Sequence, residues 1–188
     1  MSYEQDQAER AGRGREPCAE MAVGEVIRLL DALDAAGVPV WVDGGWGVDA
    51  LFGEQRRQHD DLDLVIEMKN VSTLQRVLKE LDYTFQRRDA PLSFELVAPD
   101  GRQVDVHPVT FNERGDGIYQ KDDGKTWTYP AEGLAGRGEI GGRRVRCLTP
   151  ELQMRVHSGY EFSAKDHDEV RDLQERFGVD PPEGYKRP

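Results

Sequence analysis

Two aspartates separated by one residue are the first candidates for chemistry in this sequence. Asp61 and Asp63 lie within an otherwise apolar run, Asp-Leu-Asp-Leu-Val-Ile, at positions 61–66. Side chains alternate along a strand, so the two carboxylates project from one face and repel each other unless a cation lies between them. Carboxylate oxygens suit magnesium, which takes one or two of them together with substrate phosphates. We therefore predict that this pair holds magnesium; the alternative is an acidic strand edge that faces solvent.

A third acid lies in a later strand pattern, Gln-Val-Asp-Val-His, at positions 103–107. Asp105 and His107 alternate with valines, so both belong to the polar face of this strand. If the strand pairs beside the first, three acids share one face, as in sites that use one or two cations for phosphoryl or nucleotidyl transfer. Asp105 is then either a metal ligand or the base that accepts the proton of an attacking hydroxyl.

A pair of glycines, Gly44 and Gly45, follows an apolar segment and opens a short predicted helix. Glycine lets backbone N–H groups approach an anion closely, and a helix N-terminus favours negative charge. We expect these N–H groups to bind the phosphates of a nucleotide; a tight turn is the structural alternative. Arg57 and His59, in the next loop, are candidates for further phosphate contacts, the alternative being a solvated charged loop.

Two polar residues are candidates for binding a second substrate, the acceptor of the transferred group. Asp49 lies in the short predicted helix, where it either orients the acceptor or caps a local loop. His107 shares the face of Asp105 and either contacts the acceptor or pairs with an acid.

Hydrophobic periodicity predicts the elements that must position these residues. Helices are expected at 23–33, 46–52, 71–81 (with Asn70 as its cap), 149–160 and 164–177. Strands are expected at 38–42, 61–67, 83–88, 93–98, 103–109, 139–140 and 143–148, with a long loop at 111–138 that contains one strand near 127–129.

This order of elements predicts an α/β (α+β) fold, with a mixed β-sheet flanked by helices and a small helical C-terminal part. At 188 residues the chain has the length of one domain. We expect a disordered leader at 1–20, a core at 21–148 and the helical part at 149–188, the last two forming one compact unit.

Charge and hydropathy exclude several classes of protein. Asp plus Glu number 36 against 25 Lys plus Arg, a net charge of -11, which argues against binding along a nucleic-acid backbone. No apolar run approaches the roughly 18 residues that a membrane span needs. The charged N-terminus has no apolar segment typical of an export signal. These features predict a cytoplasmic protein without nucleic-acid or membrane partners.

The combined motifs resemble those of the small antibiotic nucleotidyltransferases, the lincosamide nucleotidyltransferases and aminoglycoside 2″-adenylyltransferases of the DNA polymerase beta-like superfamily. The resemblance spans roughly 23–173 and is closer to the lincosamide branch. It rests on Val-Trp-Val-Asp-Gly-Gly-Trp-Gly-Val-Asp-Ala-Leu (40–51), Arg-Gln-His-Asp-Asp-Leu-Asp-Leu (57–64), Asp-Val-His-Pro (105–108) and His-Ser-Gly-Tyr (157–160). Where the superfamily often has Gly-Ser this chain has Gly-Gly, so a hydroxyl contact to phosphate is missing.

The resemblance implies an enzyme that transfers a nucleoside monophosphate to a hydroxyl of a small antibiotic-like acceptor, a lincosamide or an aminoglycoside, and releases pyrophosphate. The donor would be a nucleoside triphosphate, foremost ATP with one or two Mg²⁺ ions. Asp61 and Asp63 would hold the metal, and Asp105 would be the third ligand or the general base. His157 and Tyr160 would line the acceptor site, with a core or hinge role as the alternative.

Several alternatives to this function stay open at the level of the sequence. The chain would otherwise nucleotidylate another metabolite or a protein, or serve as a non-catalytic nucleotide-binding module. The acidic balance favours an amine-bearing acceptor, because a negative field concentrates cations. Some relatives pair across subunits, which makes a homodimer possible.

Overall fold

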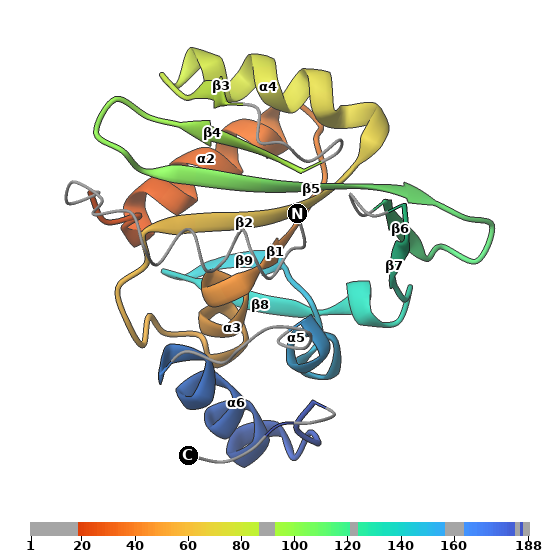
Figure 1. The fold of residues 1–188 in the computed structure, drawn as a ribbon. Helices are drawn as coiled ribbons and strands as arrows, with labels where there is room; N and C mark the ends of the chain where they lie inside the picture. Colours follow the sequence, from red (N-terminus) through yellow and green to blue (C-terminus); the bar gives the residue numbers. More distant parts are fainter. Residues whose placement is uncertain (1–18, 87–92, 121–123, 157–163, 183–184, 186–188) are drawn as a thin grey trace.

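A mixed β-sheet runs through the middle of the protein (Figure 1). The computed structural model describes residues 19–86, 93–120, 124–156, 164–182 and 185. The strands of the main sheet are β1 (Val40–Asp43), β2 (Asp61–Glu67), β3 (Thr84–Gln86), β4 (Phe94–Val97), β5 (Gln103–Phe111), β6 (Gly117–Gln120) and β7 (Thr126–Tyr129). They pair in the order β1-β2-β5-β4-β3, with β6 on β5 and β7 on β6; β2 and β5 are parallel and the other pairs are antiparallel.

Five α-helices and two short 3₁₀ turns accompany the sheet in the described ranges. They are α2 (Val23–Ala35), α3 (Gly44–Phe52), η1 (Met68–Asn70), α4 (Val71–Glu80), η2 (Gly133–Ala135), α5 (Pro150–Val156) and α6 (Ala164–Phe177). A separate hairpin joins β8 (Arg137–Ile140) to β9 (Arg143–Arg146). In Figure 1, α4 and α6 lie at opposite ends of the molecule, with the sheet between them.

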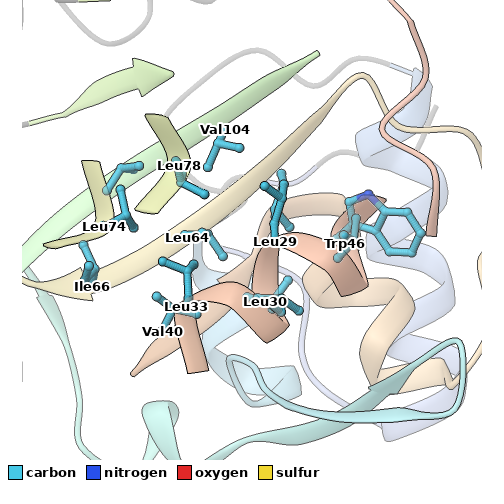
Figure 2. Packing of buried hydrophobic residues seen from close by; sticks show 14 of the residues in the cluster. Leu29, Leu30, Leu33, Val40, Trp46, Leu64, Ile66, Leu74, Leu78 and Val104 are labelled. Carbon is cyan, nitrogen blue, oxygen red and sulfur yellow. The ribbon is translucent and has the colours of Figure 1, made fainter. Parts of the chain in front are cut away.

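The hydrophobic core lies between one face of the sheet and helices α2 and α4. Period-2 alternation on β2 directs its leucines and Ile66 to this face, and the leucines of both helices recur at helical spacing to meet them. Figure 2 shows this packing around Leu29, Leu30, Leu33, Val40, Trp46, Leu64, Ile66, Leu74, Leu78 and Val104. Because one face of β2 is committed to the core, its other face is left for Asp61 and Asp63.

The C-terminal elements attach to β1 and α3. Cys147 forms a parallel bridge with Val42, and the Leu148 N–H donates to the Val42 carbonyl at 3.3 Å, so the chain after β9 runs beside β1. A smaller apolar cluster joins α3, α5 and α6, and consists of Val48, Met154, Val170, Leu173 and Val179. Helix α6 is thereby held against the helix that begins at Gly44.

The mixed α/β fold and most predicted elements are confirmed, with three corrections. Helix α3 begins at Gly44, two residues before its predicted start. The region 111–138, expected to be a long loop with one strand, contains the two strands β6 and β7. Its Gly and Asp content is typical of a loop, but β6 pairs with β5, and β7 pairs with β6. Asn70 belongs to a 3₁₀ turn, and its side chain makes no capping bond to α4.

Parts of other predictions lie outside the described residues. These are the leader up to residue 18 and the end of the helix expected at 149–160, which the structure describes only to Val156. In the described ranges, no helix is long and apolar enough to cross a membrane.

We predict that Leu64→Ala lowers the free energy of unfolding by about 2–5 kcal/mol, because Leu64 is fully buried on β2 and truncation leaves a cavity in the core. Urea denaturation measures this loss. The matched control is Leu81→Ala, since Leu81 is only partly buried at the end of α4 and its site can relax. Equal losses at the two positions would contradict the placement of the core.

Candidate active site

Four carboxylates lie in one row across four neighbouring strands. In the strand registers Asp43 is opposite Asp63, Asp63 is opposite Asp105, and Asp105 is opposite Glu95. Neighbouring strands are about 4.8 Å apart, so register partners present their side chains on the same face at close spacing. Asp43, Asp105 and Glu95 are each at most 7% exposed. Burying so many like charges is unfavourable unless cations or hydrogen bonds compensate.

The structure brings the three predicted acids onto one face, as the alternation and the assumed pairing of their strands required. Asp63 and Asp105 are direct partners on the parallel pair β2 and β5, and Asp61 lies two residues before Asp63, opposite Gln103. Asp63 is 24% exposed, so this carboxylate of the row is accessible to a ligand. The roles of the three acids stay predictions at this point.

The donor chemistry of the row fits a hard divalent cation, since all its side chains offer carboxylate oxygens. Yet among the residues that the structure describes, no group of three or more His, Cys, Asp or Glu is arranged to hold a metal ion. Magnesium usually completes its shell with water and substrate phosphates around one or two carboxylates. The row offers carboxylate oxygens of the kind that bind magnesium, and a magnesium site here stays a prediction.

The turn at Gly44 and Gly45 lies directly against this row. Gly44 has a left-handed backbone (φ 59°), and a Cβ there would collide with the Asp63 carboxylate. A Cβ at Gly45 would collide with the Arg57 guanidinium and the His59 ring. A side chain at either position would therefore force these neighbours to move, and the turn lies between an acid on one side and a cation on the other.

The Gly44 N–H is not directed at a ligand in this structure. It donates to the side chain of Asp43 at 2.7 Å, which caps the start of α3, and the Gly44 carbonyl accepts from Gln153 Nε2 at 2.6 Å. These bonds fit the tight-turn alternative for Gly44, and binding of phosphate by the N–H groups of Gly44 and Gly45 stays a prediction. An anion at this turn would also meet a cationic side chain, which lies against Gly45.

That cation is Arg57, in the loop between α3 and β2. Its Nε and Nη2 donate to Glu169 Oε1 at 2.8 and 2.6 Å, and its Nη1 donates to the Gln58 carbonyl at 3.0 Å. The side chain is 31% exposed. Arg57 is therefore both fixed in place and open to solvent beside the turn.

His59 and Asp49 form the buried support of the same loop. Both side chains are at most 3% exposed, and His59 Nε2 lies 2.5 Å from Asp49 Oδ2. Asp49 also accepts the Arg56 N–H at 3.2 Å, and the His59 ring packs against Trp46 with centroids 4.7 Å apart. These contacts fit the alternative for Asp49, a local cap, and its binding of an acceptor stays a prediction. His59 is only 2% exposed, and a contact of its ring with phosphate stays a prediction.

His107 connects the acids to polar residues of neighbouring strands. Its Nε2 lies 3.5 Å from Asp63 Oδ1, and its Nδ1 lies 3.3 Å from the Ser93 hydroxyl. The Ser93 hydroxyl in turn lies 2.5 Å from the Tyr119 hydroxyl, and the Tyr119 ring meets the imidazole edge-on. Of the two alternatives for His107, pairing with an acid is the one that these contacts support.

The acids around His107 shift the pKa of its imidazole. Burial alone lowers the pKa of the imidazole, but the hydrogen bond that its ring N–H donates to Asp63 and the negative charges of Asp63, Asp43 and Asp105 raise this pKa above its usual value. A positive charge on this imidazole would offset part of the repulsion among the acids.

The sequence prediction missed several members of this site. Asp43 and Glu95 complete the row, Ser93 and Tyr119 contact each other beside His107, and Glu169 holds Arg57. Alternation along β1 and β4 contained the signal for the first two. His157 and Tyr160, predicted to bind the acceptor, lie outside the described residues.

Comparison with known protein sequences gives matches over most of the chain. The model of the family described as aminoglycoside-2''-adenylyltransferase matches residues 25–173. A lincosamide resistance protein of Staphylococcus haemolyticus is 27% identical over 150 residues, which cover 80% of this chain and 92% of that protein. A 2''-aminoglycoside nucleotidyltransferase of Escherichia coli is 32% identical over 130 residues, which cover 65% of this chain and 64% of the relative's own length.

Comparison with solved structures agrees. The lincosamide antibiotic adenylyltransferase LnuA, in its lincomycin-bound crystal structure, has a TM-score of 0.74 at 26% identity over 83% of this chain and 98% of that chain. ANT(2'')-Ia in complex with adenylyl-2''-tobramycin has a TM-score of 0.66 at 22% identity over 83% and 89%, a likeness of fold.

We predict that Gly44→Ala destabilises the protein more than Gly37→Ala does, by at least about 1 kcal/mol. Both glycines have positive φ, so both substitutions incur the left-handed strain of about 1–2 kcal/mol. Only at Gly44 does the added methyl group also meet a side chain, that of Asp63, whereas nothing lies within 4 Å at Gly37. Urea denaturation of the two variants measures the difference, and equal losses would show that Asp63 does not lie against the turn.

Proposed function

Because the chain belongs to the aminoglycoside-2''-adenylyltransferase family, we propose that it transfers AMP from ATP to a hydroxyl group of an antibiotic and releases pyrophosphate. The observation that carries this proposal is the pairing of Asp63 with Asp105 on adjacent parallel strands, directly against the turn at Gly44 and Gly45. Acids of this kind beside a cation suit a reaction in which a phosphoryl group passes between two oxygens.

In the proposed reaction the hydroxyl oxygen of the antibiotic attacks the α-phosphorus of ATP. The bond from that phosphorus to the β-phosphate oxygen breaks, and pyrophosphate leaves with the electron pair. The proton of the hydroxyl passes to a carboxylate of the row or to solvent. Asp105 is the candidate for the carboxylate that takes up this proton, because it is buried between Asp63 and Glu95. The alternative role for Asp105 is that of a third metal ligand.

Asp61 and Asp63 would hold magnesium together with the phosphates, since they share one face and Asp63 is accessible. When bound, the metal would neutralise charge on the triphosphate and stabilise the leaving pyrophosphate. Arg57 would contact the phosphates from the side of Gly45, where its guanidinium is fixed but open to solvent.

The acceptor would lie on the same face of the sheet, beside His107 and the aromatic residues of β6 and β7. Tyr119 and Trp127 are only partly buried there, and the Arg155 guanidinium lies 5.4 Å from the Trp127 ring centroid. The lincosamide relative matches over nearly its whole length, which supports a lincosamide over an aminoglycoside as the acceptor. The alternatives, another metabolite or a non-catalytic module, have no support in the comparisons.

A mass-shift screen tests the proposed function. The protein is incubated with ATP and magnesium together with lincosamides and aminoglycosides in turn, and each acceptor is weighed by mass spectrometry. We expect one acceptor class to gain the mass of one AMP, with pyrophosphate released in equal amount. No adduct on any member of either class, with nucleotide and metal saturating, would overturn the proposal.

We predict that Asp63→Asn and Asp105→Asn each lower the rate of transfer by at least about 10²-fold while the fold survives. The amide is nearly isosteric but lacks the negative charge that metal binding and proton transfer require. Turnover with a saturating acceptor and circular dichroism measure the two properties. The control is Asp31→Asn, since Asp31 is a largely exposed surface acid that pairs with Arg143. Near-normal turnover in either site variant would remove that residue from the reaction.

We predict that the KM for an amine-bearing acceptor rises with salt between about 0.1 and 1 M. The acid row and the net charge of -11 attract cations, and the Debye length falls from about 10 to 3 Å over this range. An aminoglycoside, with several ammonium groups, should show a steeper rise than a lincosamide. Steady-state kinetics at saturating nucleotide measure the effect, and a KM that does not change with salt would contradict an amine-recognising site.

A further inference from the structure

Two ion pairs tie the loop before the candidate acids to the C-terminal helix α6. Arg57 pairs with Glu169 at 2.6 Å, and Arg56 pairs with Asp172 at 3.0 Å. The two acids are three residues apart, so they lie on neighbouring positions of one helix face. Arg57 and Glu169 are 112 residues apart in sequence, so their ion pair joins distant parts of the chain.

The two arginines of these ion pairs, referred to below as the two ties, have different surroundings. The Arg57 guanidinium lies against Gly45, where an added Cβ would collide with its Nη2. The next residue back, Gly44, lies against the Asp63 carboxylate. Arg56 instead packs over the Phe52 ring, 4.2 Å from its centroid, with its Nε 3.9 Å from Asp49. Only the first tie acts on a cation that faces the candidate site.

The bonds of Arg57 leave its outer donors available. A guanidinium has five N–H donors, and in the described residues three bonds engage one on Nε, one on Nη2 and one on Nη1. Two donors remain, one on each terminal nitrogen. Two such donors form the fork that binds two oxygens of one phosphate group. Glu169 is only 4% exposed, so its carboxylate is a fixed anchor for this geometry.

We propose that Glu169 is a positioning residue for nucleotide binding: it fixes the Arg57 guanidinium beside the Gly44–Gly45 turn, so that helix α6 contributes to affinity for the triphosphate. This inference rests on the proposed function. Without the anchor, the long arginine side chain must be ordered when nucleotide binds, and that ordering costs about 0.5–1.5 kcal/mol, or a 2- to 13-fold loss of affinity. A neutral acceptor at the same position retains most of the geometry.

Equilibrium binding of ATP with magnesium, measured by calorimetry on the full chain without any antibiotic acceptor, tests the inference. We expect Glu169→Ala to raise the Kd for ATP by about 3- to 10-fold and Glu169→Gln to raise it less, because the amide oxygen still accepts from Arg57. The matched control is Asp172→Ala, which removes the other tie and should change the Kd by less than twofold.

A double-mutant cycle separates positioning from a general structural effect. If Glu169 acts through Arg57, then Glu169→Ala has no further effect on the Kd in an Arg57→Ala background. Additive losses, an unchanged or lower Kd in Glu169→Ala, or an equal loss in Asp172→Ala would each overturn the inference and leave the proposed function standing. A wild-type chain that binds no nucleotide at all would overturn both.

Discussion

The main physical constraint on this molecule is the repulsion within a row of carboxylates that the strand registers hold at close spacing. Asp63 and Asp105 are neighbours only because β2 and β5 are parallel and in a defined register. A shift of one residue would turn either side chain to the opposite face of the sheet. The buried leucines on the other face of β2 make such a shift costly. The hydrophobic core therefore provides the free energy that keeps like charges together.

The turn at Gly44 adapts the backbone to this row. Its glycines leave room for the Asp63 carboxylate and for the guanidinium of Arg57, so opposite charges lie against adjacent residues of one turn. Asp43, which belongs to the row, also caps the helix that the turn begins. The acids are thus part of the local structure as well as candidates for chemistry, which explains why a helix begins at two residues of low helical propensity.

The local pattern predicted much of the fold and the site, and failed where distant segments decide. Alternation placed Asp63 and Asp105 on the polar faces of β2 and β5, and the assumed pairing of these two strands brought both acids onto one face. Alternation did not identify Glu95 as a member of the row, since its place opposite Asp105 depends on the register between β4 and β5. β6 was missed because its partner strand defines it. Asp49 was expected at a substrate, but periodicity does not show that the loop at Arg56 folds back over it.

The two ends of the strand order β1-β2-β5-β4-β3 differ in how they present main-chain groups to another polypeptide. Beyond β1, the segment at Cys147 and Leu148 bonds to Val42 and so occupies main-chain groups that another polypeptide would otherwise pair with. At the far end β3 has three residues, all exposed, and Phe85 on it is 49% exposed. The three residues described for β3 offer few main-chain bonds to an incoming strand, and a short edge strand is one of the ways in which natural proteins discourage aggregation through open sheet edges. The end at β1 is thus covered by another segment of the chain, whereas the described part of β3 presents only a short edge.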